Sequence, residues 1–147
     1  MFMRMYLKDE SETQSLGKRL AAIARPGDVL LLQGQLGAGK SSLARAFIRT
    51  LMGDPHLAVP SPTFTLVQTY EMPDGTEISH YDLWRLDGPD ALDELGWDEA
   101  LSGITLVEWP DRLGDLAPAN AWRLRFLLCR VGREIEIEGD LRGFDGS

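Results

Sequence analysis

A glycine-rich segment carries the residue types and spacing of a phosphate-binding loop. The run from Gly34 to Ser41 matches the pattern G-x-x-x-x-G-K-[ST]. In this pattern the glycines let backbone N–H groups turn towards a phosphate, the lysine reaches the β- and γ-phosphates, and the hydroxyl binds magnesium. We therefore predict a nucleotide site with a magnesium ion. The residues expected at the phosphates are Gly37, Ala38, Gly39, Lys40, Ser41 and Ser42.

Two acidic residues that end apolar or alternating segments are candidates for holding magnesium and preparing a water molecule. Glu108 follows the apolar run Ile104–Val107, and Asp82 lies two residues after His80. Nucleotide hydrolysis needs a carboxylate near the metal and a group that positions the attacking water. We predict that Lys40, Asp82 and Glu108 are catalytic and that both acids lie near magnesium. Which carboxylate activates water, and whether His80 is more than structural, stays open.

Features beside these acids admit more than one interpretation. The turn Ser61–Phe64 is rich in hydroxyls and either senses the γ-phosphate through Thr63 or simply leads into a strand. Trp84 and Trp109 closely follow the acidic candidates, where they shield the site, contact a partner or pack in the core. We expect core packing for Trp84. The chain has no N-K-x-D guanine-reading motif, which favours ATP and ADP as ligands.

Composition limits the partners and the compartment. The formal net charge of −8 repels nucleic-acid backbones, so we expect no direct contact with RNA or DNA. The single cysteine, Cys129, cannot form an internal disulfide, and we interpret it as a buried thiol in a reducing cytoplasm. Residues 1–10 carry no signal-peptide core, and no apolar run is long enough for a membrane span.

The elements that must position these residues form an α/β pattern. Ser11 and Gln14 have capping-box spacing, so we predict a helix over Ser11–Ala24. The glycine-rich segment stands between a buried strand and a helix ending near Gly53, and residues 89–101 suggest short helical pieces interrupted at Gly96. The predicted strands are Val29–Leu32, Thr63–Tyr70, Thr76–Tyr81, Ile104–Val107, Trp122–Cys129 and Glu134–Glu138.

These elements predict a single P-loop NTPase-like domain over residues 1–147, with a central mixed β-sheet flanked by helices. Pro73-Asp74-Gly75 supplies the turn of an antiparallel hairpin between two of the strands. The length suits one hydrophobic core, and the chain shows no internal repeat or linker. We expect the tail from about residue 139 to be loose.

Four segments in a fixed order resemble the TsaE (YjeE) family of bacterial ATPases. They are the glycine-rich loop Gly34–Ser41, the SPTFTLV segment at 61–67, the HYDLWRL segment at 80–86 and the LVEWP segment at 106–110. The loop alone is shared by many families, whereas the other three segments are specific. The resemblance implies an ATPase needed for N6-threonylcarbamoyladenosine (t6A) at adenosine 37 of tRNA. It further implies docking to a TsaB–TsaD heterodimer, contact with tRNA only through these partners, and weak hydrolysis by the isolated protein.

The resemblance also implies roles for individual residues. Lys40 would bind phosphate, Ser41 and Glu108 would contact magnesium, and Asp82 would be a catalytic or metal-organising acid. Thr63 and Trp109 would report the nucleotide state to a partner. Thr13 and Arg133 match positions near the nucleotide. The family commonly has threonine at position 41 and tyrosine at position 84, and the serine keeps the magnesium-binding hydroxyl.

Two other functional classes fit the same loop. A small-molecule kinase would need an acceptor pocket and an arginine-rich lid, and the late arginines lie instead in predicted strands. The cluster consists of Arg123, Arg125, Arg130 and Arg133. A nucleotide-dependent adaptor would bind ATP without turning it over, and sequence does not separate it from an ATPase.

Overall fold

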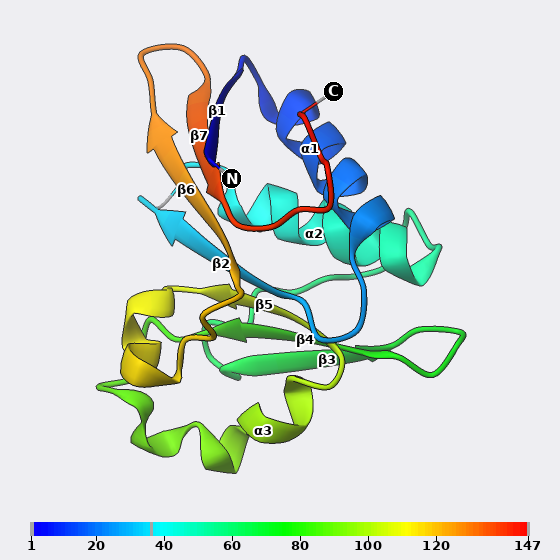
Figure 1. Cartoon of the computed structure of the whole chain (residues 1–147), viewed down its shortest axis with the longest axis vertical. Helices are drawn as coiled ribbons and strands as arrows, with labels where there is room; N and C mark the ends of the chain where they lie inside the picture. Colours follow the sequence, from blue (N-terminus) through cyan, green and yellow to red (C-terminus); the bar gives the residue numbers. More distant parts are fainter. Residues whose placement is uncertain (1, 36, 147) are drawn as a thin grey trace.

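The computed structural model describes residues 2–35 and 37–146. The strands in this part of the chain form one mixed β-sheet (Figure 1). Its seven strands follow the order β1-β7-β6-β2-β5-β4-β3. Leu36 of the glycine-rich segment, Met1 and Ser147 lie outside the described residues. The strands are β1 (Phe2–Leu7), β2 (Val29–Gly34), β3 (Val67–Glu71), β4 (Glu77–Asp82), β5 (Ile104–Glu108), β6 (Trp122–Leu128) and β7 (Arg133–Glu138). The helices are α1 (Glu10–Ile23), α2 (Lys40–Met52) and α3 (Trp97–Ala100), with 3-10 helices η1 (Pro89–Ala91), η2 (Asp93–Leu95) and η3 (Pro110–Leu116).

The centre of the sheet is parallel and its flanks are antiparallel. β2 pairs in parallel with β5 and β6, and β5 pairs in parallel with β4. The residues Val29–Leu32 are all buried, which fits a strand covered on both faces. β7 pairs antiparallel with β1 and β6, and β3 pairs antiparallel with β4. The predicted α/β class with a mixed sheet is confirmed.

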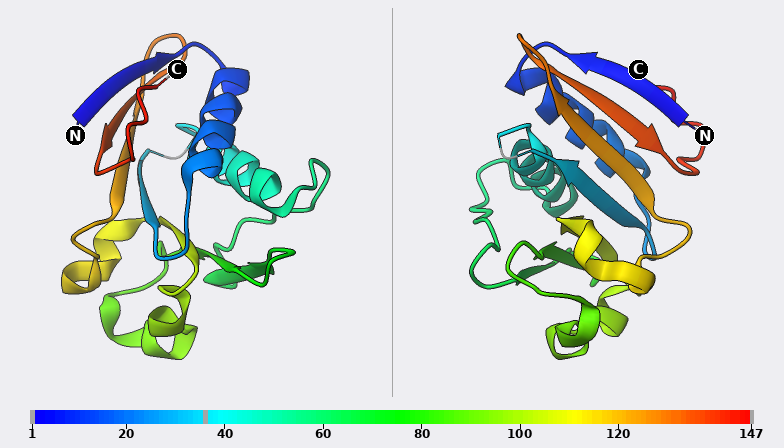
Figure 2. Two further views of the ribbon diagram at one scale, coloured as in Figure 1. Left: turned by 45° about the vertical axis from the view of Figure 1, so that its right-hand side comes forward. Right: turned by 90° about the vertical axis from the view of Figure 1, so that its left-hand side faces the viewer.

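Helices cover the two faces of the sheet unequally. α1 and α2 pack on one face, where Leu16, Leu20 and Phe47 are fully buried against residues of β2, β6 and β7. On the other face, the short segments η1, η2, α3 and η3 pack on β4 and β5 around Tyr81 and Trp97, whose rings meet edge to face at 5.3 Å. Figure 2 shows these green and yellow segments at the end of the molecule away from α1.

The N-terminal region differs from the sequence prediction. α1 is capped by Asp9, whose side chain accepts a hydrogen bond from the Glu12 N–H at 3.1 Å, so the capping box predicted at Ser11 is wrong. Residues 2–7 form an edge strand that was not predicted, because its apolar residues occupy both faces. The strand is identified by its pairing with β7, where Arg4 forms ion pairs at 2.9 Å with Glu134 and 2.7 Å with Glu136.

The hairpin of β3 and β4 is shorter at its start than expected. β3 begins at Val67 and not at Thr63, because Leu66 has a left-handed backbone (φ 71°) and its N–H donates to the Pro62 carbonyl at 2.6 Å. The turn at Pro73–Gly75 is confirmed, since the Met72 N–H donates to the Thr76 carbonyl at 2.8 Å. The helical pieces predicted on both sides of Gly96 are also confirmed.

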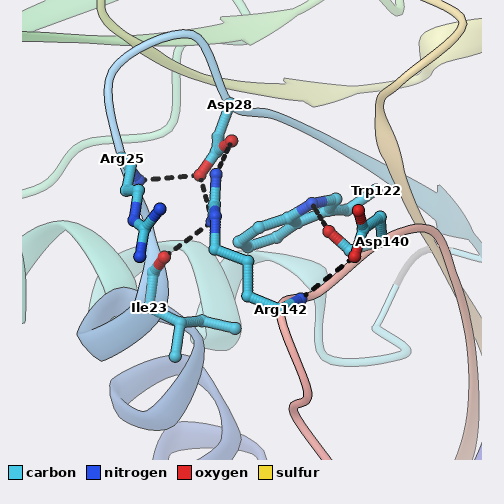
Figure 3. A network of polar contacts seen from close by, with 6 residues as sticks. All are labelled: Ile23, Arg25, Asp28, Trp122, Asp140 and Arg142. Carbon is cyan, nitrogen blue, oxygen red and sulfur yellow. Dashed lines mark hydrogen bonds and ion pairs between the residues drawn. The ribbon is translucent and has the colours of Figure 1, made fainter.

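The tail is anchored to the body of the protein, contrary to the expected loose end (Figure 3). The Arg142 guanidinium donates to the two Asp28 carboxylate oxygens at 2.6 and 2.9 Å and to the Ile23 carbonyl at 2.7 Å. The Trp122 indole N–H donates to the Asp140 carbonyl at 3.2 Å, and Leu141 is 1% exposed. This short segment has no periodic pattern, so only these long-range contacts reveal its order.

Two further expectations about side-chain burial are wrong. Cys129 is exposed because it lies in the turn that follows β6, beyond the last buried position of the strand. Trp84 is 47% exposed and does not belong to the core, since it follows the end of β4 at the rim of the sheet. Among the described residues, no helix is long and apolar enough to cross a membrane.

Candidate nucleotide-binding site

The two acidic candidates meet at the carboxyl ends of parallel strands. Asp82 ends β4, Glu108 ends β5, and the two residues are register partners across the strand pair. Glu108 also lies opposite Leu32 of β2, the strand that leads into the glycine-rich segment. Both acids are only 4% exposed. The topology therefore gathers two buried carboxylates beside the start of α2, at the edge where open α/β sheets bind ligands.

The described part of the glycine-rich segment has the backbone that glycine allows. Gly37 and Gly39 have φ angles of 80° and 109°, and Gly39 is the N-cap of α2. A side chain at Gly39 would also come within 3.2 Å of Arg133. α2 begins at Lys40, so its first backbone N–H groups and its dipole lie beside the loop. This arrangement can bind a phosphate.

A cavity of about 340 Å³ opens between this loop and the two acids. It is lined by Glu10, Gly37, Gly39, Lys40, Ser41, Ser42, Ser61, Thr63, Asp82, Glu108, Trp109 and Arg133. Most residues that the sequence analysis singled out therefore surround one space. Two of them do not line it: Ala38 is fully buried behind the loop, and Thr13 is fully buried in α1.

Lys40 is held at the base of the loop. Its ammonium Nζ donates to the Gly34 carbonyl at 2.7 Å and lies 4.1 Å from the centre of the Trp109 ring. Burial lowers the pKa of Lys40, and the negative charges of Glu108, Asp82 and Asp111 oppose that shift. The ammonium thus contacts a carbonyl and a ring face, and an anionic phosphate can replace both contacts.

The two carboxylates have different hydrogen-bond environments. Asp82 accepts from the Thr63 hydroxyl at 2.9 Å through one oxygen and from the Trp84 N–H at 3.0 Å through the other. Glu108 uses Oε2 in a 2.8 Å contact with His80 Nε2, and no described residue bonds its Oε1. The Nδ1 of His80 is buried without a hydrogen-bond partner among the described residues. Asp82 is therefore fixed at both oxygens and Glu108 at one.

This donor set suits magnesium bound together with phosphates. No three His, Cys, Asp or Glu side chains gather into a metal site within residues 2–35 and 37–146. Magnesium, however, typically takes one or two carboxylates and completes its shell with phosphate oxygens and water. Ser41, Asp82 and Glu108 line the same cavity and supply a hydroxyl and two carboxylates. The residues present therefore fit a magnesium–nucleotide complex better than a free ion.

A second pair of residues, Arg133 and Thr13, lies beside Gly39 of the loop. Arg133 of β7 donates through Nη1 to the Thr13 hydroxyl of α1 at 3.0 Å. Thr13 thus stands behind Arg133, which itself lines the cavity. Their separation of 120 residues in the chain means that no local pattern could have linked them.

Sequence reasoning missed two contacts at the cavity. Glu10 lines it and accepts a hydrogen bond from the Ser42 hydroxyl at 2.8 Å, so the Ser42 side chain is directed to α1. Trp84 and Trp109 pack together with ring centres 4.4 Å apart, and Trp109 has a left-handed backbone (φ 59°). The spacing of each tryptophan after an acid at the end of neighbouring strands was a signal for the second contact. Glu10 gave none.

Comparisons with known proteins agree with this geometry. Residues 7–135 match the family model "Threonylcarbamoyl adenosine biosynthesis protein TsaE". The TsaE protein of Rickettsia bellii is 43% identical over 113 residues, which cover 76% of this chain and 77% of that protein. Longer Rickettsia relatives also match, and this chain covers 59% of the one from Rickettsia conorii.

More distant bacteria give the same result. The TsaE protein of Bacillus subtilis is 39% identical over 124 residues, covering 82% of this chain and 73% of that protein. The crystal structure of Bacillus subtilis YdiB superposes with a TM-score of 0.75 at 30% identity and covers 93% of this chain and 84% of the other. Sequence and fold therefore point to one family.

Proposed function

The chain belongs to the TsaE family and has its role in tRNA threonylcarbamoyladenosine biosynthesis, and we propose that it acts there as a magnesium-dependent ATPase. The observation that carries the proposal is the cavity of about 340 Å³, where Lys40, Ser41, Asp82 and Glu108 meet. A phosphate-binding loop, a magnesium-type hydroxyl and two buried carboxylates are the parts that nucleotide hydrolysis requires.

Lys40 and the start of α2 bind the phosphates in this proposal. The Lys40 ammonium leaves the Gly34 carbonyl and the Trp109 ring and donates to the β- and γ-phosphates of ATP. The backbone N–H groups at Gly39 and Lys40 face the same anion at the N-terminus of α2. Arg133, which is held by Thr13 and lies beside Gly39, contributes a second cation.

Ser41 and Asp82 would hold the metal in this proposal, and Glu108 would contact it through water. A magnesium ion held by these residues would supply neutralisation of the charge on the phosphate oxygens. Asp82 is pinned by Thr63 and the Trp84 N–H, which suits an organising role. Glu108 keeps Oε1 available while His80 holds Oε2, so we assign to Glu108 the acceptance of the water proton.

The same contacts connect the nucleotide to the surface. Thr63 bonds Asp82, and the exposed Phe64 follows it directly. Trp109 touches Lys40 on one side and the exposed Trp84 on the other. A phosphate that draws Lys40 away from the Trp109 ring would therefore also change the packing of Trp109 against Trp84. We propose that a TsaB–TsaD heterodimer reads this rim and stimulates turnover.

Phosphate release from ATP tests the proposal. We expect slow, magnesium-dependent release by the chain alone and faster release with purified TsaB–TsaD, and loss of both rates in Lys40→Ala. Arg123→Gln, on the exposed side of β6, is a matched control that removes one positive charge elsewhere. ATP binding without release, even with both partners, would identify a nucleotide-dependent adaptor. Transfer of labelled phosphate to a metabolite would identify a kinase.

A further inference from the structure

His80 lies one row behind the two acids of the nucleotide cavity. It stands on β4 two residues before Asp82, so both side chains project from the same face of the sheet. Its register partner on β5 is Leu106, two residues before Glu108. Residues on one face of a strand are about 7 Å apart, a span that an imidazole and a carboxylate side chain bridge together. This placement accounts for the 2.8 Å contact between His80 and Glu108.

The contact between His80 and Glu108 is shielded from water. The two side chains are 3% and 5% exposed. Glu108 lines the nucleotide cavity and His80 does not, so the imidazole meets the carboxylate from the inside of the protein. Oε2 is engaged in this contact, whereas no described residue bonds Oε1. The carboxylate therefore keeps one oxygen for groups that enter the cavity.

The two ring nitrogens of His80 have different surroundings. Nε2 lies 2.8 Å from Glu108 Oε2, and Nδ1 is buried without a hydrogen-bond partner among the described residues. A carboxylate accepts hydrogen bonds, so Nε2 must carry a proton for this contact to be a bond. A ring protonated only at Nδ1 would leave a buried donor unpaired and turn a lone pair towards the carboxylate. The geometry thus makes Nε2–H the donor to Glu108.

The two acids of the cavity are held by different parts of the chain. Asp82 accepts from the hydroxyl of Thr63, which lies in the segment before β3. Glu108 is held instead from β4, which pairs with β3 on one side and β5 on the other. A strand paired on both sides is a rigid support. The position of Glu108 therefore does not depend on the segment that contains Thr63.

We propose that His80 is a positioning residue of the ATPase reaction, which holds Oε2 of Glu108 and so presents Oε1 to the attacking water. The inference rests on the proposed function. There, water adds to the γ-phosphorus, the bond to the ADP oxygen breaks, and Oε1 takes the water proton. A base must lie within hydrogen-bond reach of that proton, and a displacement of about 1 Å can cost about 100-fold in rate.

Single-turnover phosphate release with TsaB–TsaD, together with calorimetric titration of ATP, tests the proposal. His80→Leu removes the donor and keeps an apolar side chain in the buried position. We expect the release rate to fall by about 10- to 100-fold, the usual cost of losing a group that orients a functional side chain. ATP affinity should change by less than about threefold, because the phosphate-binding groups are untouched. His80→Gln, whose amide nitrogen can donate in place of Nε2, should stay within about fivefold of the unsubstituted rate.

Two controls separate positioning from packing. Ile78→Val trims a fully buried side chain on the same strand and face without touching the hydrogen bond, and it should leave the release rate unchanged. In a Glu108→Gln background, His80→Leu should slow release no further, because the imidazole acts only through the carboxylate. Equal losses in His80→Leu and His80→Gln, or additive losses in the double variant, would overturn the positioning role.

A spectroscopic signature tests the contact without any turnover. Long-range proton–nitrogen NMR correlations distinguish protonated from unprotonated ring nitrogens. The chain has two histidines, so the signals that persist in His56→Gln belong to His80. We expect a proton on Nε2 of His80 in the nucleotide-free protein. An Nε2 without a proton would overturn the proposal.

The outcomes distinguish this inference from the proposed function. Absence of phosphate release by the unsubstituted protein with TsaB–TsaD would contradict the ATPase function, and the positioning role with it. Equal release by the unsubstituted protein and by His80→Leu would overturn the positioning role alone and leave the ATPase function in place.

Discussion

The nucleotide cavity and a groove of about 310 Å³ along the seam between α1 and α2 are neighbours of opposite character. Both are lined in part by Ser42, and the Glu10–Ser42 hydrogen bond stands between them. The cavity contains three carboxylates, of Glu10, Asp82 and Glu108, as well as two cations. The groove has three cations and one carboxylate, which belong to Lys18, Arg45, Arg49 and Asp54. A site for magnesium and phosphate needs carboxylates as well as cations, and the cavity brings both together.

The two regions also differ in how firmly their groups are held. The cavity draws side chains from α1, α2, β4, β5 and β7, and its central charged groups are 4% exposed. The groove uses mainly two adjacent helices and includes an exposed lysine. Charged groups buried among fixed partners contribute more per contact than exposed ones. Substitutions in the cavity should therefore have the larger effects.

The largest effect is expected for Glu108→Gln. The amide keeps the size of the side chain and can still contact His80, but it cannot accept the water proton. We expect partner-stimulated phosphate release to fall by about 10²- to 10⁴-fold, the usual contribution of a general base. Single-turnover phosphate release measures this step, with ATP binding measured in parallel. Retention of more than a tenth of the rate would contradict the role assigned to Glu108.

The next largest effect is expected for Lys40→Ala. Loss of charge-assisted hydrogen bonds to two phosphates should weaken ATP binding by about 100-fold. Folding stability should not fall in parallel, because burial of the ammonium lowers its pKa and so disfavours the charged form in the folded state. Calorimetric titration with ATP and thermal unfolding measure the two quantities. Weak binding accompanied by a large loss of stability would point to a structural role instead.

A position outside both regions tests whether effects there reflect stability alone. Arg142→Met removes the guanidinium, which bonds Asp28 and lies over the Trp122 ring, but keeps the apolar part of the side chain. We expect the free energy of unfolding to fall by about 1–2 kcal/mol, because the 27% exposed arginine leaves behind a buried carboxylate. Urea unfolding measures the change. The ATP affinity at a temperature where the protein is folded should match that of the unsubstituted protein.

The smallest effect is expected at the partition between the two regions. Ser42→Ala removes one exposed hydrogen bond to Glu10 and leaves both sets of charged groups in place. We expect the ATP affinity to change by less than about fivefold, equivalent to about 1 kcal/mol. Isothermal titration calorimetry with ATP measures the change. A larger loss of ATP affinity would show that the Ser42 hydroxyl contacts the nucleotide itself.

Several parts of the fold and site could be predicted because their signals are local. The glycine spacing and Lys40 lie within eight consecutive residues, and the apolar run before Glu108 identifies a buried strand by itself. The strand containing His80 and Asp82 was found in the same way. Parallel pairing then brings both acids to one edge, since such strands share a direction.

Local patterns failed where the two faces of a segment look alike or where no periodicity exists. The first strand has apolar residues on both faces, so only its pairing with β7 identifies it. Cys129 and Trp84 are apolar residue types, yet both follow the end of a strand and are exposed. A residue type predicts only an average burial, and positions just after the end of a strand depart from that average.

The sequence by itself determined the phosphate-binding loop, the two acids and the family, because each is written in short, ordered segments. Only the tertiary structure decided which distant residues contact one another. Arg133 reaches Thr13 across 120 residues, and Arg142 reaches Asp28 across 114. The groove beside the cavity likewise exists only where α1 and α2 pack together. These features depend on distances in space, which the order of residues along the chain does not express.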